Sequence, residues 1–193
     1  MTNSNEAWKE DWAPLIARVG QSFGNRLPRA GAERIELSAI RRFLEVLEFD
    51  APIHHDVDAA REAGYADVIA PVSSLLSFTI PPLWEPGMAA AFIEAGRDAQ
   101  PTRPVGGGKP IGVSDRYPSY FATDMDFEYL RPVVLGERLA RGAPRLVSCE
   151  PKQTKVGRGA FIKFETDLVT ETGEVVAKQL IGMYVYAPTE ASS

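Results

Sequence analysis

Apolar residues divide this chain into a helical first half and a strand-rich second half. In residues 38–47, apolar side chains recur every three or four positions, with charged side chains between them, which predicts an amphipathic helix. The apolar positions are Ile40, Phe43, Leu44 and Leu47. Ser38 is a residue type that caps helix N-termini, and Pro52 cannot continue a helix, so we expect the helix to lie between them.

Two further helices are expected before residue 81. Asp56 is placed to cap a short helix over residues 57–63, and Gly64 suits the left-handed position that follows a helix. Residues 72–80 are apolar on nearly all sides, which predicts a buried helix that ends before Pro81 and Pro82.

Residues 83–120 are punctuated by proline and glycine. Within them, residues 88–99 are a candidate short helix, and the remainder is predicted to be loop. A loop of this length inside a compact domain is usually functional or mobile.

From Met125 onward the period changes to two, which indicates strands. Residues 139–150, 160–170 and 175–186 are further strand candidates, and Thr172-Gly173 is a hairpin turn between the last two. An antiparallel sheet beside one buried helix predicts an α+β fold.

Composition narrows the class of protein. A chain of 193 residues with 45% hydrophobic residues fits a single domain over residues 1–193, and a net charge of −5 argues against nucleic-acid binding. One cysteine, Cys149, excludes an internal disulfide, and with only two histidines a structural zinc site is not expected. We find no targeting signal and no stretch suited to span a membrane, so a cytoplasmic location is expected.

Three segments in this order resemble the MaoC-like dehydratases, most closely the branch with a FAS1-like N-terminal domain. The first segment starts with Phe49-Asp50-Ala51-Pro52-Ile53-His54-His55-Asp56, and the second starts with Val68-Ile69-Ala70-Pro71. The third starts with Phe127-Glu128-Tyr129-Leu130-Arg131-Pro132 and is taken together with the hairpin around Gly173. The resemblance covers about residues 30–187. It implies a hot-dog fold, in which a sheet wraps a central helix, here residues 72–80, with residues 83–120 as an insertion. It also implies pairing of two hot-dog units, as a homodimer or a heteromer, with active sites near their junction.

The family signature is Gly-Asp-x-Asn-Pro-Leu-His, whose Asp and His are the catalytic pair. Aligned on the proline, His54 takes the place of the catalytic His, while Phe49 stands at the Asp and Ala51 at the Asn. Asp50 comes one residue late. Either the loop is one residue shorter and Asp50 still serves, or the acid is missing.

The resemblance implies hydration or dehydration of an acyl thioester carried by coenzyme A or a carrier protein, with no metal or redox cofactor. His54 is the expected acid/base, because histidine titrates near neutral pH, and Asp50 is its expected carboxylate partner. The N–H of Val72 is the expected oxyanion contact, helped by that of Ser73, since first-turn amides lack partners within a helix. Candidate walls of an acyl pocket include Trp84, Tyr117 and Tyr120.

Three other functions stay open. The displaced acid and the insertion suit a non-catalytic subunit that shapes the tunnel of a catalytic partner. A hot-dog thioesterase is less favoured, because residues 72–80 contain no Asp or Glu to activate water. The apolar helix and wide loop also suit a small-ligand-binding protein without chemistry.

Overall fold

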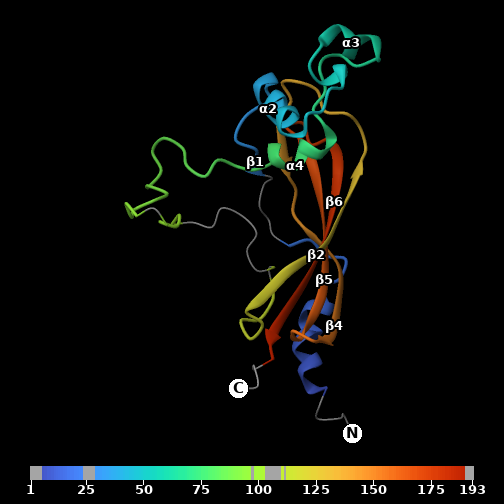
Figure 1. Cartoon of the computed structure of the whole chain (residues 1–193). Helices are drawn as coiled ribbons and strands as arrows, with labels where there is room; N and C mark the ends of the chain where they lie inside the picture. Colours follow the sequence, from blue (N-terminus) through green and yellow to red (C-terminus); the bar gives the residue numbers. More distant parts are fainter. Residues whose placement is uncertain (1–5, 24–28, 97, 103–109, 111, 190–193) are drawn as a thin grey trace.

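The structure is a computed structural model, and it describes residues 6–23, 29–96, 98–102, 110 and 112–189. Its frame is a six-stranded antiparallel sheet in the order β1-β3-β5-β6-β2, with β4 also pairing with β5. The strands are β1 (Arg29–Ala30), β2 (Ser119–Tyr129), β3 (Leu139–Arg141), β4 (Arg145–Thr154), β5 (Gly157–Thr170) and β6 (Val175–Pro188). In Figure 1, β5 and β6 run along most of the length of the elongated molecule.

Strand β5 shows why alternation predicted this sheet. From Ala160 to Thr170 its residues alternate between buried and partly buried positions, because successive side chains point to opposite faces. The strand predicted over residues 139–150 is interrupted, so that β3 and β4 lie one after the other along the same edge of β5. Pro144, in the gap, has no N–H for the ladder. Strand β2 begins at Ser119, six residues before the predicted Met125.

The helices cover the sheet at its two ends. They are the 3-10 helices η1 (Ala7–Trp12), η2 (Pro52–His54) and η3 (Val72–Ser74), and the α-helices α1 (Ala13–Ile16), α2 (Leu37–Leu47), α3 (Val57–Glu62) and α4 (Leu75–Phe78). Helix α2 starts one residue before Ser38, with Glu36 at the N-cap position. The expected cap of α3 is confirmed, since the Asp56 carboxylate accepts bonds from the N–H groups of Asp58 and Ala59.

The central helix is shorter than residues 72–80. It consists of the turn η3 followed by α4, and it buries only one side. Leu75 is 1% exposed, whereas Val72 and Ile80 are 46% and 53% exposed. The expectation of a helix buried on all sides is therefore wrong for its two ends.

Two hydrophobic clusters lie along the sheet. The upper cluster, at the α2 and α4 end in Figure 1, joins Ile40, Leu44 and Leu75 to Leu168 and Ala177 of the sheet. The lower cluster packs η1 and α1 on the other end of the sheet. Its members include Trp12, Leu15, Phe23, Tyr117, Leu146, Cys149, Ile162 and Val185.

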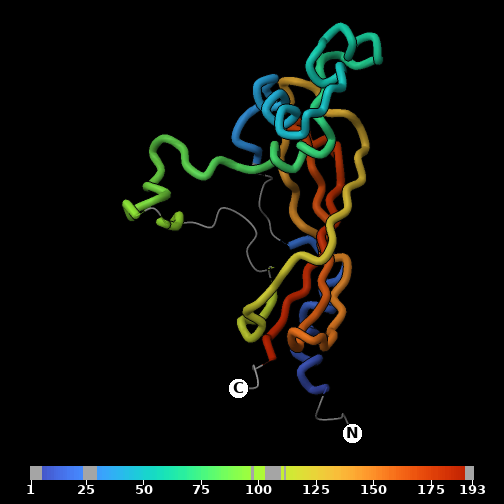
Figure 2. The backbone as a smooth tube through the Cα atoms, in the orientation of Figure 1, coloured from blue at the N-terminus to red at the C-terminus, as the bar shows by residue number. Residues whose placement is uncertain are grey.

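The insertion after α4 loops away from the sheet (Figure 2). The described residues of the predicted helix 88–99 contain turns and no helix, so that prediction is wrong. The N–H of Thr102 bonds back to the carbonyl of Ala91 at 2.7 Å, which closes a loop. No helix in the described part of the chain is long and apolar enough to cross a bilayer.

Candidate active site

His54 lies on a short turn between α2 and α3. Pro52 opens the turn η2, where its missing N–H costs nothing, and Asp56 begins α3 directly after it. This places the His54 side chain inward, 7% exposed, while His55 points to solvent. The ring of Phe49 lies 5.7 Å from the His54 ring, centroid to centroid.

The backbone of Ile69 holds the His54 ring. His54 Nδ1 lies 2.8 Å from the carbonyl oxygen of Ile69, and the Ile69 N–H donates to the carbonyl of Ile53 at 3.2 Å. A carbonyl oxygen only accepts hydrogen bonds, so Nδ1 must carry the proton. In the neutral ring Nε2 is then unprotonated, which is the form that a general base requires.

Asp50 contacts the other histidine. Its Oδ1 lies 2.9 Å from His55 Nε2, and its side chain is 90% exposed. The predicted bond between Asp50 and His54 is therefore not present, and that pairing is wrong. The physical reason is the direction of the turn, which buries His54 against Ile69 and leaves Asp50 and His55 together at the surface.

The segment that holds His54 leads directly into the central helix. The Ala70 N–H donates to Val133 at 2.8 Å, and the Leu135 N–H donates to Val68 at 2.9 Å, which fixes this segment as a short ladder. Val72 follows three residues after Ile69. Among the residues that the structure describes, the N–H groups of Val72 and Ser73 meet no acceptor.

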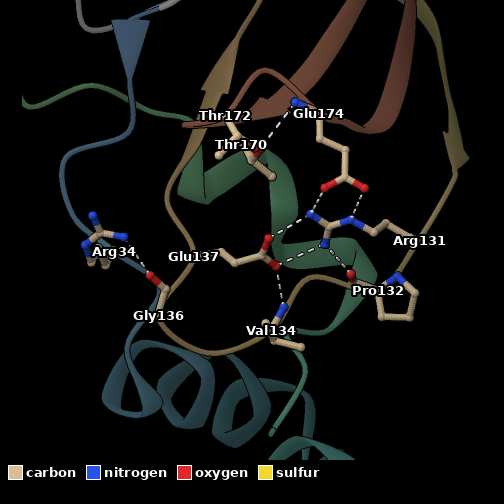
Figure 3. A network of polar contacts seen from close by, with 9 residues as sticks. All are labelled: Arg34, Arg131, Pro132, Val134, Gly136, Glu137, Thr170, Thr172 and Glu174. Carbon is tan, nitrogen blue, oxygen red and sulfur yellow. Dashed lines mark hydrogen bonds and ion pairs between the residues drawn. The ribbon is translucent and has the colours of Figure 1, made fainter. Parts of the chain in front are cut away.

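An ion-pair network around Arg131 holds the segment that pairs with Val68 and Ala70 (Figure 3). The Arg131 guanidinium donates to both carboxylate oxygens of Glu137 and of Glu174, with distances of 2.7–3.0 Å. These bonds raise the pKa of Arg131 and lower the pKa of Glu174. Glu137 also accepts from the Val134 N–H at 2.7 Å. Arg131 therefore positions Val133, which pairs with Ala70, through the residues on either side of it.

The expected pocket residues lie in different places. Ser73 is exposed beside Val72, and Trp84 is 49% exposed in the insertion, where its Nε1 donates to the Met88 carbonyl. Tyr120 is 39% exposed on the edge strand β2.

Tyr117 belongs to the lower cluster, away from α4 and η3. It is 2% exposed, and it lines a cavity of about 360 Å³ together with Asp11 and Trp12. Its hydroxyl donates to Asp11 at 2.9 Å, and burial followed by this bond raises the pKa of Tyr117 to about 12. No described contact joins it to the part of the site formed by His54 and Val72.

Together, His54 and the Val72 turn offer a base and unpaired amide donors on adjoining segments. Within the described ranges, no group of three or more His, Cys, Asp or Glu residues could hold a metal ion. The arrangement suits proton transfer next to a carbonyl whose oxygen gains negative charge.

Solved structures with the same architecture define the fold. The chain superposes on a chain of the ChsH1–ChsH2 complex of Mycobacterium tuberculosis with a TM-score of 0.64 and 23% identity, covering 96% of this chain and 94% of that one. A MaoC-like dehydratase of Rhodospirillum rubrum gives a TM-score of 0.52 at 18% identity, covering 85% and 94%. The protein is thus an α+β protein with the hot-dog fold.

Sequence comparison gives the family. The model of the FAS1-like, dehydratase domain region matches residues 19–179, and the chain belongs to this family of MaoC-like hot-dog proteins. It is 31% identical over 169 residues to a probable enoyl-CoA hydratase alpha subunit of Thermomonospora curvata, covering 86% of this chain. The chain spans only 48% of that relative's length. It is also 30% identical to a UPF0336 protein of Streptomyces griseus subsp. griseus, covering 90% of this chain and 99% of that one. The family is therefore one of hydratases and dehydratases.

Proposed function

We propose that this chain acts on an enoyl-CoA or 3-hydroxyacyl thioester, adding or removing water reversibly, with His54 as the acid/base. The bond from His54 Nδ1 to the Ile69 carbonyl carries the proposal, because it leaves Nε2 as the basic nitrogen. The name of the Thermomonospora relative, an enoyl-CoA hydratase subunit, supports the choice of substrate.

The proposed hydration uses His54, which is bonded to the Ile69 carbonyl, and the N–H groups of Val72 and Ser73, which follow Ile69 in the chain. Nε2 of His54 takes a proton from water, the water oxygen bonds to Cβ, and the electron pair of the double bond moves toward the thioester oxygen. The N–H of Val72, with that of Ser73, stabilises this oxygen, and the proton then returns from His54 to Cα. Asp50, which is 90% exposed and bonded to His55, takes no part in these steps. These steps use no metal or redox cofactor.

Turnover of crotonyl-CoA tests the proposal, with His54→Ala and His55→Ala as a matched pair. Loss of an acid/base typically costs about 10²–10⁴-fold in rate, and we expect that loss only for His54→Ala. If His54→Ala keeps full activity while His55→Ala does not, the base is His55, and our assignment is overturned. Release of free thiol in the same assay would identify a thioesterase instead.

A second candidate function is a non-catalytic subunit of a heteromeric dehydratase. It is favoured by the separation of Asp50 from His54 and by the subunit name of the relative. Co-expression with a MaoC-like partner distinguishes the two functions, since this candidate predicts that activity needs the partner and survives His54→Ala.

We also propose that the chain pairs with another hot-dog subunit, a second copy or a different chain. Strand β2 pairs only with β6 among the described strands, and it exposes Phe121, Met125 and Tyr129. Light scattering of the purified chain measures the assembly, and a monomer at micromolar concentration would contradict a homodimer.

A further inference from the structure

A polar seam crosses the inner face of the sheet between the two hydrophobic clusters. On β5, Phe164 belongs to the lower cluster and Leu168 to the upper one, while Thr166 lies between them and is 4% exposed. Gln179 lies opposite Thr166 on β6 and is 1% exposed. Such buried polar groups are normally hydrogen-bonded.

Arg141 supplies the bond from the far side of β5. Its Nη2 donates to Gln179 Oε1 at 2.6 Å, so its side chain reaches across the strand that separates β3 from β6. The Gln179 amide nitrogen lies 3.3 Å from the Met125 sulfur. Leu139, two residues before Arg141, shares its face of β3 and belongs to the upper cluster.

Among the described residues, no carboxylate forms an ion pair with Arg141, whose side chain is bonded to Gln179. Arg131 and Arg145 are paired with Glu137 and Glu165, whereas the partner of Arg141 is a neutral amide. Arg141 as a whole residue is exposed. The protein around its guanidinium nevertheless desolvates this group and lowers its pKa. A guanidinium has five donors, so most of them remain for a planar anion.

Arg141 also lies on the same side of the sheet as the candidate active site. Gly31 packs against the carbonyl of Phe78 so tightly that a Cβ would not fit, and its N–H donates to the Leu139 carbonyl. Leu139 therefore adjoins the last residue of α4, and Arg141 lies two residues further toward the lower cluster. Since η3 and α4 together span roughly 10 Å, a ligand held at Val72 could extend along them toward Arg141.

We propose that Arg141, oriented by Gln179, binds an anionic oxygen group of the ligand. This inference deepens the proposed function and rests on it for the thioester. The anion is either a carboxylate at the far end of the acyl chain or a phosphate of coenzyme A, and both offer the paired oxygens that a guanidinium recognises.

Free anions test the site without any turnover. Adipate and inorganic phosphate are titrated calorimetrically into the full chain, into Arg141→Gln, and into Arg145→Gln as a matched control that removes a paired arginine. We expect Arg141→Gln to weaken binding of at least one anion about tenfold and Arg145→Gln to leave it unchanged. Equal affinity in Arg141→Gln and wild type, or no binding of either anion, overturns the proposal. Arg141→Lys, which keeps the charge, guards against a folding defect and should retain part of the affinity.

Thioesters then identify the source of the anion. If Arg141 binds an acyl carboxylate, Arg141→Gln weakens adipoyl-CoA but not hexanoyl-CoA; if it binds phosphate, both are weakened equally. Anion binding that depends on Arg141, in a protein that hydrates no enoyl-CoA even with a MaoC-like partner, would reject the proposed function and keep the site. Hydration of crotonyl-CoA with no effect of Arg141→Gln on any ligand would do the reverse.

Discussion

His54 Nδ1 lies 2.8 Å from the carbonyl oxygen of Ile69, so a backbone acceptor sets the protonation of the imidazole. We predict that the neutral His54 ring carries its proton on Nδ1 and leaves Nε2 unprotonated, because the carbonyl can only accept. Nitrogen-15 NMR of histidine-labelled protein at a pH where His54 is neutral checks this, with His54→Ala to assign the signal. A neutral ring protonated on Nε2 would contradict the proposed base.

Asp50 is bonded to His55 rather than to His54, and its side chain is 90% exposed. We predict that Asp50→Asn changes crotonyl-CoA turnover by no more than about twofold, because an exposed carboxylate bonded to His55 is not placed to move a proton of the reacting water. His55→Ala, which removes the bond but keeps the carboxylate, serves as the control. A loss of about tenfold or more in Asp50→Asn would show instead that Asp50 takes part in the chemistry.

Leu75 connects the central helix to the upper cluster and is 1% exposed. We predict that Leu75→Ala lowers the free energy of unfolding by about 2–5 kcal/mol, through lost burial and the cavity that remains. Val46→Ala, at a position 84% exposed on α2, should change it by less than about 0.5 kcal/mol. Urea denaturation measures both values, and similar losses for the two variants would argue against this packing.

The Tyr117 hydroxyl is buried beside Asp11, which raises its pKa from 10.0 to about 12. The folded protein therefore holds a proton that the unfolded chain releases between these values. The stabilising contribution is complete below pH 10 and is lost as the pH rises toward 12. We predict that Tyr117→Phe makes the loss of stability over this range less steep. Parallel curves for the two proteins, followed by tryptophan fluorescence in urea at each pH, would contradict the prediction.

Local patterns in the sequence determined most of the sheet and the ends of several helices. Alternation over residues 160–170 predicted β5, since the period of two follows from strand geometry alone. Asp56 and Gly64 predicted the limits of α3, because capping depends on neighbouring backbone atoms. The ordered motifs from Phe49 to Gly173 identified the family.

Contacts distant in sequence were decided only by the tertiary structure. The resemblance to MaoC-like dehydratases implied that Asp50 and His54 form a pair, but the turn at Pro52 buries the His54 side chain and leaves Asp50 at the surface, and the partner of His54 is a backbone oxygen 15 residues away. Backbone acceptors leave no mark on residue identity, so no motif could have indicated Ile69. The bond from Arg141 to Gln179 likewise joins side chains 38 residues apart. Which of two histidines is buried, and whether Arg141 meets a carboxylate or an amide, depends on how the strands and turns pack.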